Sequence, residues 1–235
     1  GFATFGGLSV NLTGSKQLTA SSGALTPVSS TPFVVSPAAA SVVTFDVQPS
    51  DAAAGAAIAP AVRVKVADAF GNGVPGADLA LSLIGSGTLS GAAPASTNAN
   101  GLATFGALSI DLAGAKQLAV ASGALAPATS NAFTISPGPA ATLAFSVQPS
   151  DAVAGATIAP AVQVQVTDAF GNAVVGDSVA LGLVGAGSLT GGAAVLSDAS
   201  GVATFAALSV DLAGSRQLTA TSGALAPVTS TSFTV

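Results

Sequence analysis

The chain contains no histidine, cysteine, methionine, tryptophan or tyrosine, and its 235 residues include no glutamate either. Histidine, cysteine and tyrosine supply most general bases, soft metal ligands and activated nucleophiles in enzymes. Their absence predicts a protein that is not an enzyme and holds no cofactor. The lack of cysteine also excludes disulfide bonds, although it does not indicate a compartment.

Charge is scarce as well, because only 6% of the residues are charged and the net charge is −5. Phosphate recognition needs clustered basic residues, and of the five in this chain only Arg63 and Lys65 lie close together. We therefore expect no nucleic-acid partner. No uninterrupted apolar run approaches the roughly 18 to 20 residues of a membrane span, so this segment is not expected to insert into a membrane.

What the chain does contain is a repeat of 100 residues: GFATFGGLSV at position 1 returns as GLATFGALSI at 101 and GVATFAALSV at 201. Residues 41–135 and 141–235 agree without gaps at roughly 60% of positions, which indicates duplication of a whole domain. Such a unit is long enough to bury a core of its own. Proline-containing linkers begin at residues 36 and 136.

Division of the chain at this 100-residue period predicts three domains. Residues 37–136 and 137–235 are complete units, here named repeat A and repeat B. Residues 1–36, the partial repeat, match only the last third of a unit, so we expect the sequence to begin inside a domain. The partial repeat then needs upstream chain, or strands from a neighbouring subunit, to cover its core face.

Apolar residues alternate with polar ones inside each unit, which is typical of half-buried strands. Val62, Val64 and Val66 are predicted to point inward, while Arg63, Lys65 and Ala67 between them point outward. The other predicted inward positions of repeat A are Val43, Phe45, Val47, Leu79, Leu81, Leu83, Phe105, Leu118, Val120, Phe133 and Ile135.

Turn-forming segments such as QPSD at 48, DAFGN at 68 and NANG at 98 separate these strands. About seven strands in about 95 residues, with no helical period, predict an all-β fold of tandem antiparallel immunoglobulin-like β-sandwiches. A small β-barrel is the alternative architecture.

The motifs T/A-F-x-VQPSD, PAV-x-V-x-V-x-DAFGN, G-x-ATF-x-ALS and SGALAP-x-TS resemble the bacterial immunoglobulin-like repeats of large surface adhesins, the invasin and intimin type. The resemblance spans essentially the whole chain. It implies extracellular stalk or spacer domains. Where many such repeats carry a tyrosine near the start of the penultimate strand, this chain has Lys116 and Arg216, so another interaction must hold that loop. Lys16, Lys116 and Arg216 are expected at the surface.

The DAFGN segments are the one candidate for a metal site. Asp68 and Asn72, with their copies Asp168 and Asn172, offer oxygen ligands for calcium at the end of a strand. The favoured interpretation is a turn stabilised by the aspartate side chain, because calcium takes six to eight oxygens. Phe70 and Phe170 in the same segments are candidate platforms for a ligand, although core packing is the favoured role.

The leading hypothesis is a structural segment of a long bacterial cell-surface or extracellular protein, forming a stalk, filament or sheath. Because Ala, Ser, Thr and Gln replace Lys and Glu on the outer positions, copies of the chain are expected to self-associate. The alternatives are a module that binds glycans or a receptor, and a spacer in a multidomain secreted enzyme.

Overall fold

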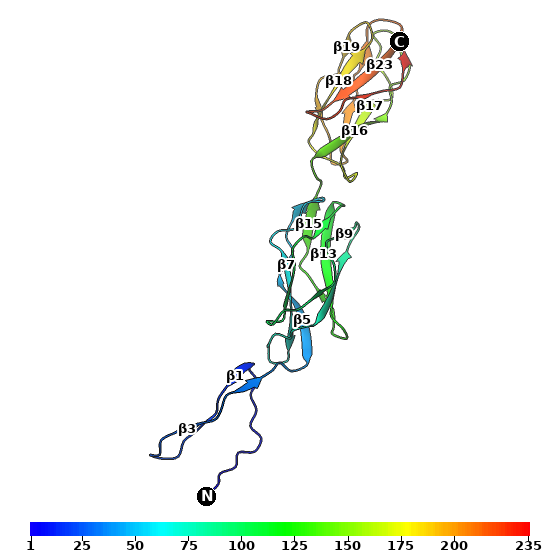
Figure 1. The fold of residues 1–235 in the computed structure, drawn as a ribbon. Helices are drawn as coiled ribbons and strands as arrows, with labels where there is room; N and C mark the ends of the chain where they lie inside the picture. The colour runs from blue at the N-terminus through cyan, green and yellow to red at the C-terminus, as the bar shows by residue number, and fades with distance from the viewer. The chain divides into compact units, whose positions relative to one another are not determined.

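The computed structural model describes residues 1–235, and Figure 1 shows the course of the chain. Every regular element is a β-strand, and no helix is present that could cross a membrane. Two compact units are formed. The first contains residues 1–51, 57–109 and 115–134, and the second contains residues 52–56, 110–114 and 135–235.

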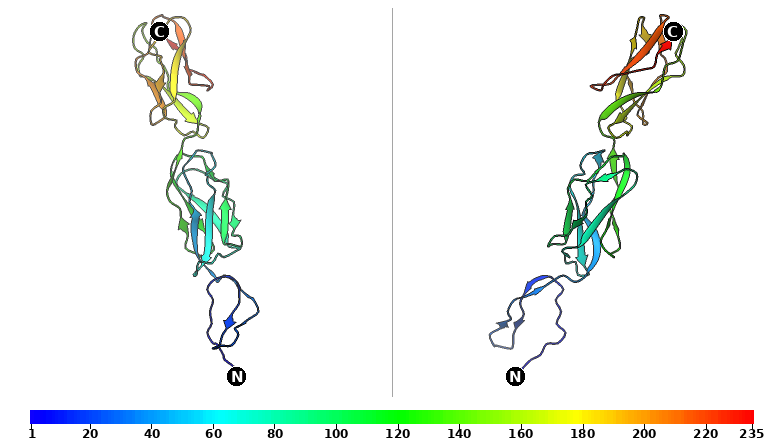
Figure 2. Two further views of the ribbon diagram at one scale, coloured as in Figure 1. Left: turned by 90° about the vertical axis from the view of Figure 1, so that its left-hand side faces the viewer. Right: turned by 45° about the vertical axis from the view of Figure 1, so that its right-hand side comes forward.

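Repeat A is a sandwich of two main sheets, which Figure 2 shows from two further sides. One sheet has the order β11–β7–β5 and the other β10–β8–β13–β15–β6, with β14 also paired to β13. A small pair, β9 with β12, lies beside them. The bounds are β5 Ala40–Val47, β6 Ala52–Ala53, β7 Val62–Asp68, β8 Asp78–Ile84, β9 Leu89–Ser90, β10 Ala95–Ser96, β11 Leu102–Phe105, β12 Ser109–Ile110, β13 Gly114–Ala121, β14 Ala128–Thr129 and β15 Phe133–Ser136.

Repeat B has the same arrangement apart from a counterpart of β6, with sheets β16–β17–β21 and β20–β18–β23–β24, the strand β25 on β23, and the pair β19 with β22. The bounds are β16 Ala140–Val147, β17 Val162–Asp168, β18 Ser178–Val184, β19 Leu189–Thr190, β20 Val195–Leu196, β21 Val202–Phe205, β22 Ser209–Val210, β23 Ser215–Thr221, β24 Val228–Thr229 and β25 Phe233–Thr234.

The partial repeat forms only two ladders, in which β1 (Gly14–Lys16) pairs with β4 (Phe33–Val35) and β2 (Thr19–Ala20) pairs with β3 (Val28–Ser29). Its hydrogen bonds to Asn72 place it in the first compact unit.

The predicted immunoglobulin-like β-sandwich is confirmed, because each complete repeat packs two sheets around an apolar core. Val62, Val64 and Val66 are fully buried, and so are Leu118 and Val120. Nearly all pairings are antiparallel; the exception is β15 with β6, which run parallel.

Two expectations about strands need correction. Repeat A has more strands than the seven predicted, since β6, β9, β10, β12 and β14 are ladders of two residues that a short alternation does not reveal. Ala67 was predicted to point outward but is buried. It pairs with Val42 on one side and forms a bridge to Gly73 on the other, so the chain after the turn covers it.

Candidate functional site

The candidate site is the DAFGN turn, residues 68–72 in repeat A and 168–172 in repeat B. In repeat A, Asp68 ends β7 and its carboxylate is buried. Its Oδ1 accepts the backbone N–H groups of Phe70 and Asn72, both at 2.9 Å. Its Oδ2 accepts the backbone N–H of Ala38 and the side-chain Nδ2 of Asn72, also both at 2.9 Å. The aspartate therefore closes the turn and fixes the linker that precedes the repeat.

The turn of repeat B reproduces this arrangement atom for atom. Asp168 Oδ1 accepts from the N–H groups of Phe170 at 2.8 Å and Asn172 at 2.9 Å. Asp168 Oδ2 accepts from Gly138 N and from Asn172 Nδ2, both at 2.8 Å. Because Ala38 and Gly138 donate through the backbone, the different residues at this linker position leave the contact intact.

The asparagine of each turn also holds a loop that belongs to the preceding repeat. Inside the second compact unit, Asn172 Nδ2 donates to the carbonyl oxygen of Asp111 at 2.8 Å, and Asn172 Oδ1 accepts from Ala113 N at 2.8 Å. Inside the first unit, Asn72 contacts Asn11 O at 2.7 Å and Thr13 N at 3.1 Å in the same way. We name this set of contacts, made by residues 68–72 with 11–13 and by 168–172 with 111–113, the joint.

The aromatic residue of the turn was expected in the core, and this expectation is wrong. Phe70 is 58% exposed and Phe170 is 47% exposed. The ring of Phe170 lies directly against Gly55, where a β-carbon would overlap the ring. Phe170 belongs to the turn and not to β17, so the alternation of side chains along the strand does not apply to it.

The contact between Gly55 and Phe170 gives a matched pair of variants. Gly55 has φ +75° and Gly155 has φ +78°, so alanine in this left-handed region costs about 1–2 kcal/mol at either position. A β-carbon at Gly155 meets no neighbouring atom within 4 Å. We expect Gly55→Ala to cost about 1–3 kcal/mol more than Gly155→Ala, because it must also displace Phe170. Equal losses in denaturant unfolding, followed by circular dichroism, would show that the ring contact contributes nothing.

The calcium candidates Asp68, Asn72, Asp168 and Asn172 are brought together in pairs, one pair in each turn. Both oxygens of each carboxylate accept two N–H donors. No group of three or more acidic, histidine or cysteine side chains gathers in a way that suits a metal ion. The oxygens that were candidate ligands thus serve as hydrogen-bond acceptors within the turn.

These bonds determine the acidity of the aspartates. Burial by itself raises the pKa of Asp68, but the hydrogen bonds from Asn72, Ala38 and Phe70 outweigh it and lower the pKa from 3.8 to about 2. For Asp168, burial again raises the pKa, and the bonds from Asn172, Gly138 and Phe170 again lower it below 3.8.

A dependence of stability on pH follows. A carboxylate with a lower pKa in the folded state stabilises the fold above its unfolded pKa, and this contribution is lost as the pH falls through the folded pKa. For Asp68 that window runs from about 3.8 down to about 2. We expect chemical denaturation to show falling stability over this range, and a shallower fall in an Asp68→Asn, Asp168→Asn double variant. The control is Asp78→Asn, because Asp78 is exposed and closes no such turn. An unchanged slope in the double variant would contradict the assignment.

A buried cation was missed in the sequence. Lys116 and Arg216 were expected at the surface, but they are only 3% and 8% exposed. The Arg216 guanidinium donates to the carbonyl oxygens of Ser215, Leu212 and Ala213, at 2.8, 3.1 and 2.9 Å. Lys116 donates from Nζ to Ser86 Oγ at 3.3 Å. The alternation along the strand already indicated this burial, because Lys116 lies on the same face of the strand as Leu118 and Val120.

In repeat B the buried cation holds the loop that is equivalent to the one the joint uses. Residues 212–215 of repeat B correspond to residues 112–115 of repeat A, and the sequence Asp-Leu-Ala-Gly is identical at 111 and 211. Asp111 and Ala113 in this loop are the partners of Asn172. In repeat B, Arg216 therefore holds this loop through backbone carbonyl oxygens, whereas Lys116 of repeat A donates to Ser86.

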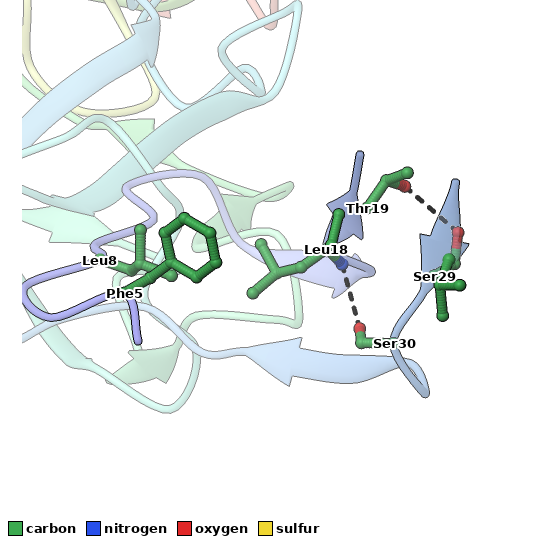
Figure 3. A pocket seen from close by; sticks show the side chains of 8 residues that line it. Phe5, Leu8, Leu18, Thr19, Ser29 and Ser30 are labelled. Atoms are coloured by element: carbon green, nitrogen blue, oxygen red, sulfur yellow. Dashed lines mark hydrogen bonds between the residues drawn. The ribbon is translucent and has the colours of Figure 1, made fainter. Parts of the chain in front are cut away.

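A second feature is a hollow of about 500 Å³ in the partial repeat, drawn in Figure 3. Its walls are mostly apolar, and it is open to solvent. Leu18 N donates to Ser30 Oγ at 3.0 Å beside it, and the hydroxyls of Thr19 and Ser29 lie 3.2 Å apart. The lining residues are Phe5, Leu8, Leu18, Thr19, Ala20, Val28, Ser29 and Ser30.

No protein-family model and no curated protein sequence matches this chain. Solved structures do match. The D0–D1 domain of intimin matches at 18% identity over 83% of this chain and 97% of that chain, with a TM-score of 0.33. The Escherichia coli adhesin FdeC matches at 20% identity over 85% of this chain and 67% of that chain, with a TM-score of 0.42. Domains 4 and 5 of the S-layer protein SbsC match at 17% identity over 84% of this chain and 99% of that chain, with a TM-score of 0.36. The chain is thus similar in fold to segments of intimin, of the adhesin FdeC and of the S-layer protein SbsC.

Proposed function

We propose that this chain is a non-enzymatic structural segment of a bacterial cell-surface or extracellular protein, in which immunoglobulin-like domains are joined in series as a stalk or filament. The observation that carries the proposal is the joint. The same asparagine atoms bind the same backbone atoms in both copies, at 11–13 and at 111–113.

The chemistry of the joint suits serial addition of domains. Asn72 and Asn172 contact only backbone atoms of the preceding loop, so Asn11 can become Asp111 and Thr13 can become Ala113 without loss of a bond. The aspartate of the same turn binds the linker through Ala38 N or Gly138 N. One turn therefore fixes both the linker and the loop, whichever repeat comes before it.

The surface and the residue inventory support the same proposal. The chain offers no histidine, cysteine, tyrosine or glutamate for catalysis. Its outer positions include exposed apolar side chains such as Val153, Val175 and Leu196. With few charges to keep neighbours apart, we propose that copies also associate with one another. The ligand-binding alternative has less support, because Phe170, one of its two aromatic candidates, already packs on Gly55.

Immunogold electron microscopy of intact cells of the source bacterium tests this function. Antibodies raised against repeat B should label the outside of the envelope, or material released from it, without permeabilisation. Bundled or sheet-like material would show the lateral association, whereas separate threads would restrict the role to a stalk. Labelling that appears only after the cells are opened would contradict the proposal.

A further inference from the structure

The turn of repeat A is followed by glycine and that of repeat B by alanine. Asn72 precedes Gly73, whereas Asn172 precedes Ala173. A β-carbon at Gly73 would overlap the carbonyl oxygen of Asn100, so packing in repeat A selects glycine. Asparagine loses its side-chain amide most readily before glycine, because glycine has no side chain to hinder the approach of its backbone nitrogen. The joint of repeat A therefore contains a chemically reactive asparagine.

The nitrogen that attacks in this reaction is not held by the strand ladder. Asp68 N donates to Asn72 O, and Val74 N donates to Val66 O, both at 2.9 Å. These bonds flank the isolated bridge at Gly73, whose own N–H therefore has no partner in the ladder. The corresponding bonds in the turn of repeat B measure 2.9 and 3.0 Å. The two turns thus differ in the residue that follows the asparagine and not in their backbone bonds.

The amide group of Asn72 makes the contacts that hold the joint closed. Its Nδ2 donates to Asp68 Oδ2 at 2.9 Å and to Asn11 O at 2.7 Å. Aspartate at this position would put a charged oxygen in the place of that donor, against a buried carboxylate and a carbonyl oxygen. Two carboxylates at this spacing repel each other, and neither acceptor keeps its donor. Loss of the amide thus breaks the bond to the loop and adds repulsion within the turn.

We propose that Asn72 is a modification site at which deamidation releases the loop at 11–13 from the turn. The backbone nitrogen of Gly73 attacks Cγ of Asn72 and forms a cyclic imide. The bond from Cγ to Nδ2 breaks, and ammonia leaves with the proton from the Gly73 nitrogen. Water then opens the ring and gives aspartate or isoaspartate. The peptide chain stays intact, so the joint of repeat A is lost irreversibly without cleavage. The reaction follows from the joint and does not depend on the proposed function.

The first test follows deamidation in the full chain and in an Ala173→Gly variant, both incubated in mildly alkaline buffer and then digested for peptide mass spectrometry. In the original chain we expect Asn72 to deamidate at least about fivefold faster than Asn172. In the variant, the rate at Asn172 should rise at least about fivefold, because only the residue after the asparagine has changed. Asn100 is exposed and also precedes glycine, so it is the reference that shows the conditions to be effective.

The second test measures what the product does to the joint. In an Asn72→Asp variant, we expect the amides of residues 11–13 to exchange hydrogen at least about tenfold faster than in the original chain. Thr13 N is the most directly affected, because it donates to Asn72 Oδ1 at 3.1 Å. Exchange in β13, which lies in the core of repeat A, should be unchanged. The matched control is Asn98→Asp, which adds the same charge outside the joint, at a position where repeat B already has aspartate.

Three results would overturn the proposal. One is an Asn72 side chain that stays intact while Asn100 deamidates. Another is a rate at Asn172 that does not change in the Ala173→Gly variant. The third is exchange at residues 11–13 that stays the same in the Asn72→Asp variant, or that rises equally in its control. Faster deamidation at Asn72, together with faster exchange in its product, supports the modification site.

Discussion

Replacing Asp168 with alanine is expected to lower the free energy of unfolding of repeat B by about 2–4 kcal/mol. The carboxylate is 2% exposed and accepts the N–H groups of Gly138, Phe170 and Asn172 together with the Asn172 side chain. Removing it leaves these donors without partners in a site where water enters poorly. Because the chain has no tryptophan or tyrosine, denaturant unfolding is best followed by circular dichroism.

The control for this variant is Asp168→Asn, which keeps one oxygen acceptor but turns an amide group toward the remaining donors. It should lose less stability than Asp168→Ala and should remove the dependence on pH that the carboxylate brings. A loss below about 1 kcal/mol for the alanine variant would show that water replaces the carboxylate at little cost.

Replacing Arg216 with methionine is expected to lower the stability of repeat B by about 1–3 kcal/mol. Methionine retains much of the apolar stem, which lies against Gly185, but it has no donor for the carbonyl oxygens of Leu212, Ala213 and Ser215. The measurement is again denaturant unfolding, with amide exchange of the loop at 211–214 as a local readout.

Arg216→Lys is the control that keeps the cation, because lysine occupies the equivalent position 116. It should lose less stability than Arg216→Met without being neutral: it removes Nε, the one buried side-chain nitrogen or oxygen atom without a hydrogen-bond partner, but Ala186 stands where Ser86 accepts from Lys116. The opposing effect is desolvation, because a buried cation without a carboxylate partner is costly. A methionine variant as stable as the original would mean that this cost equals or exceeds what the three hydrogen bonds contribute.

The inward faces of the strands followed from local pattern. Side chains of a strand alternate between two faces, so Val62, Val64 and Val66 are assigned to the core by spacing alone. The same rule places Lys116 in phase with Leu118, and only the usual preference of charge for solvent concealed its burial. Repetition at 100 residues likewise indicated tandem domains.

Periodicity along the chain was thus enough to assign the fold class, the repeat and most of the core. The role of the DAFGN turn depends instead on contacts between segments that are far apart in the sequence. Asn172 meets atoms 59 and 61 residues away, and those atoms belong to the backbone, which every residue type shares. A contact made through backbone atoms leaves no pattern of side chains in the sequence. The joint therefore follows only from the folded structure, which brings the loop and the turn together.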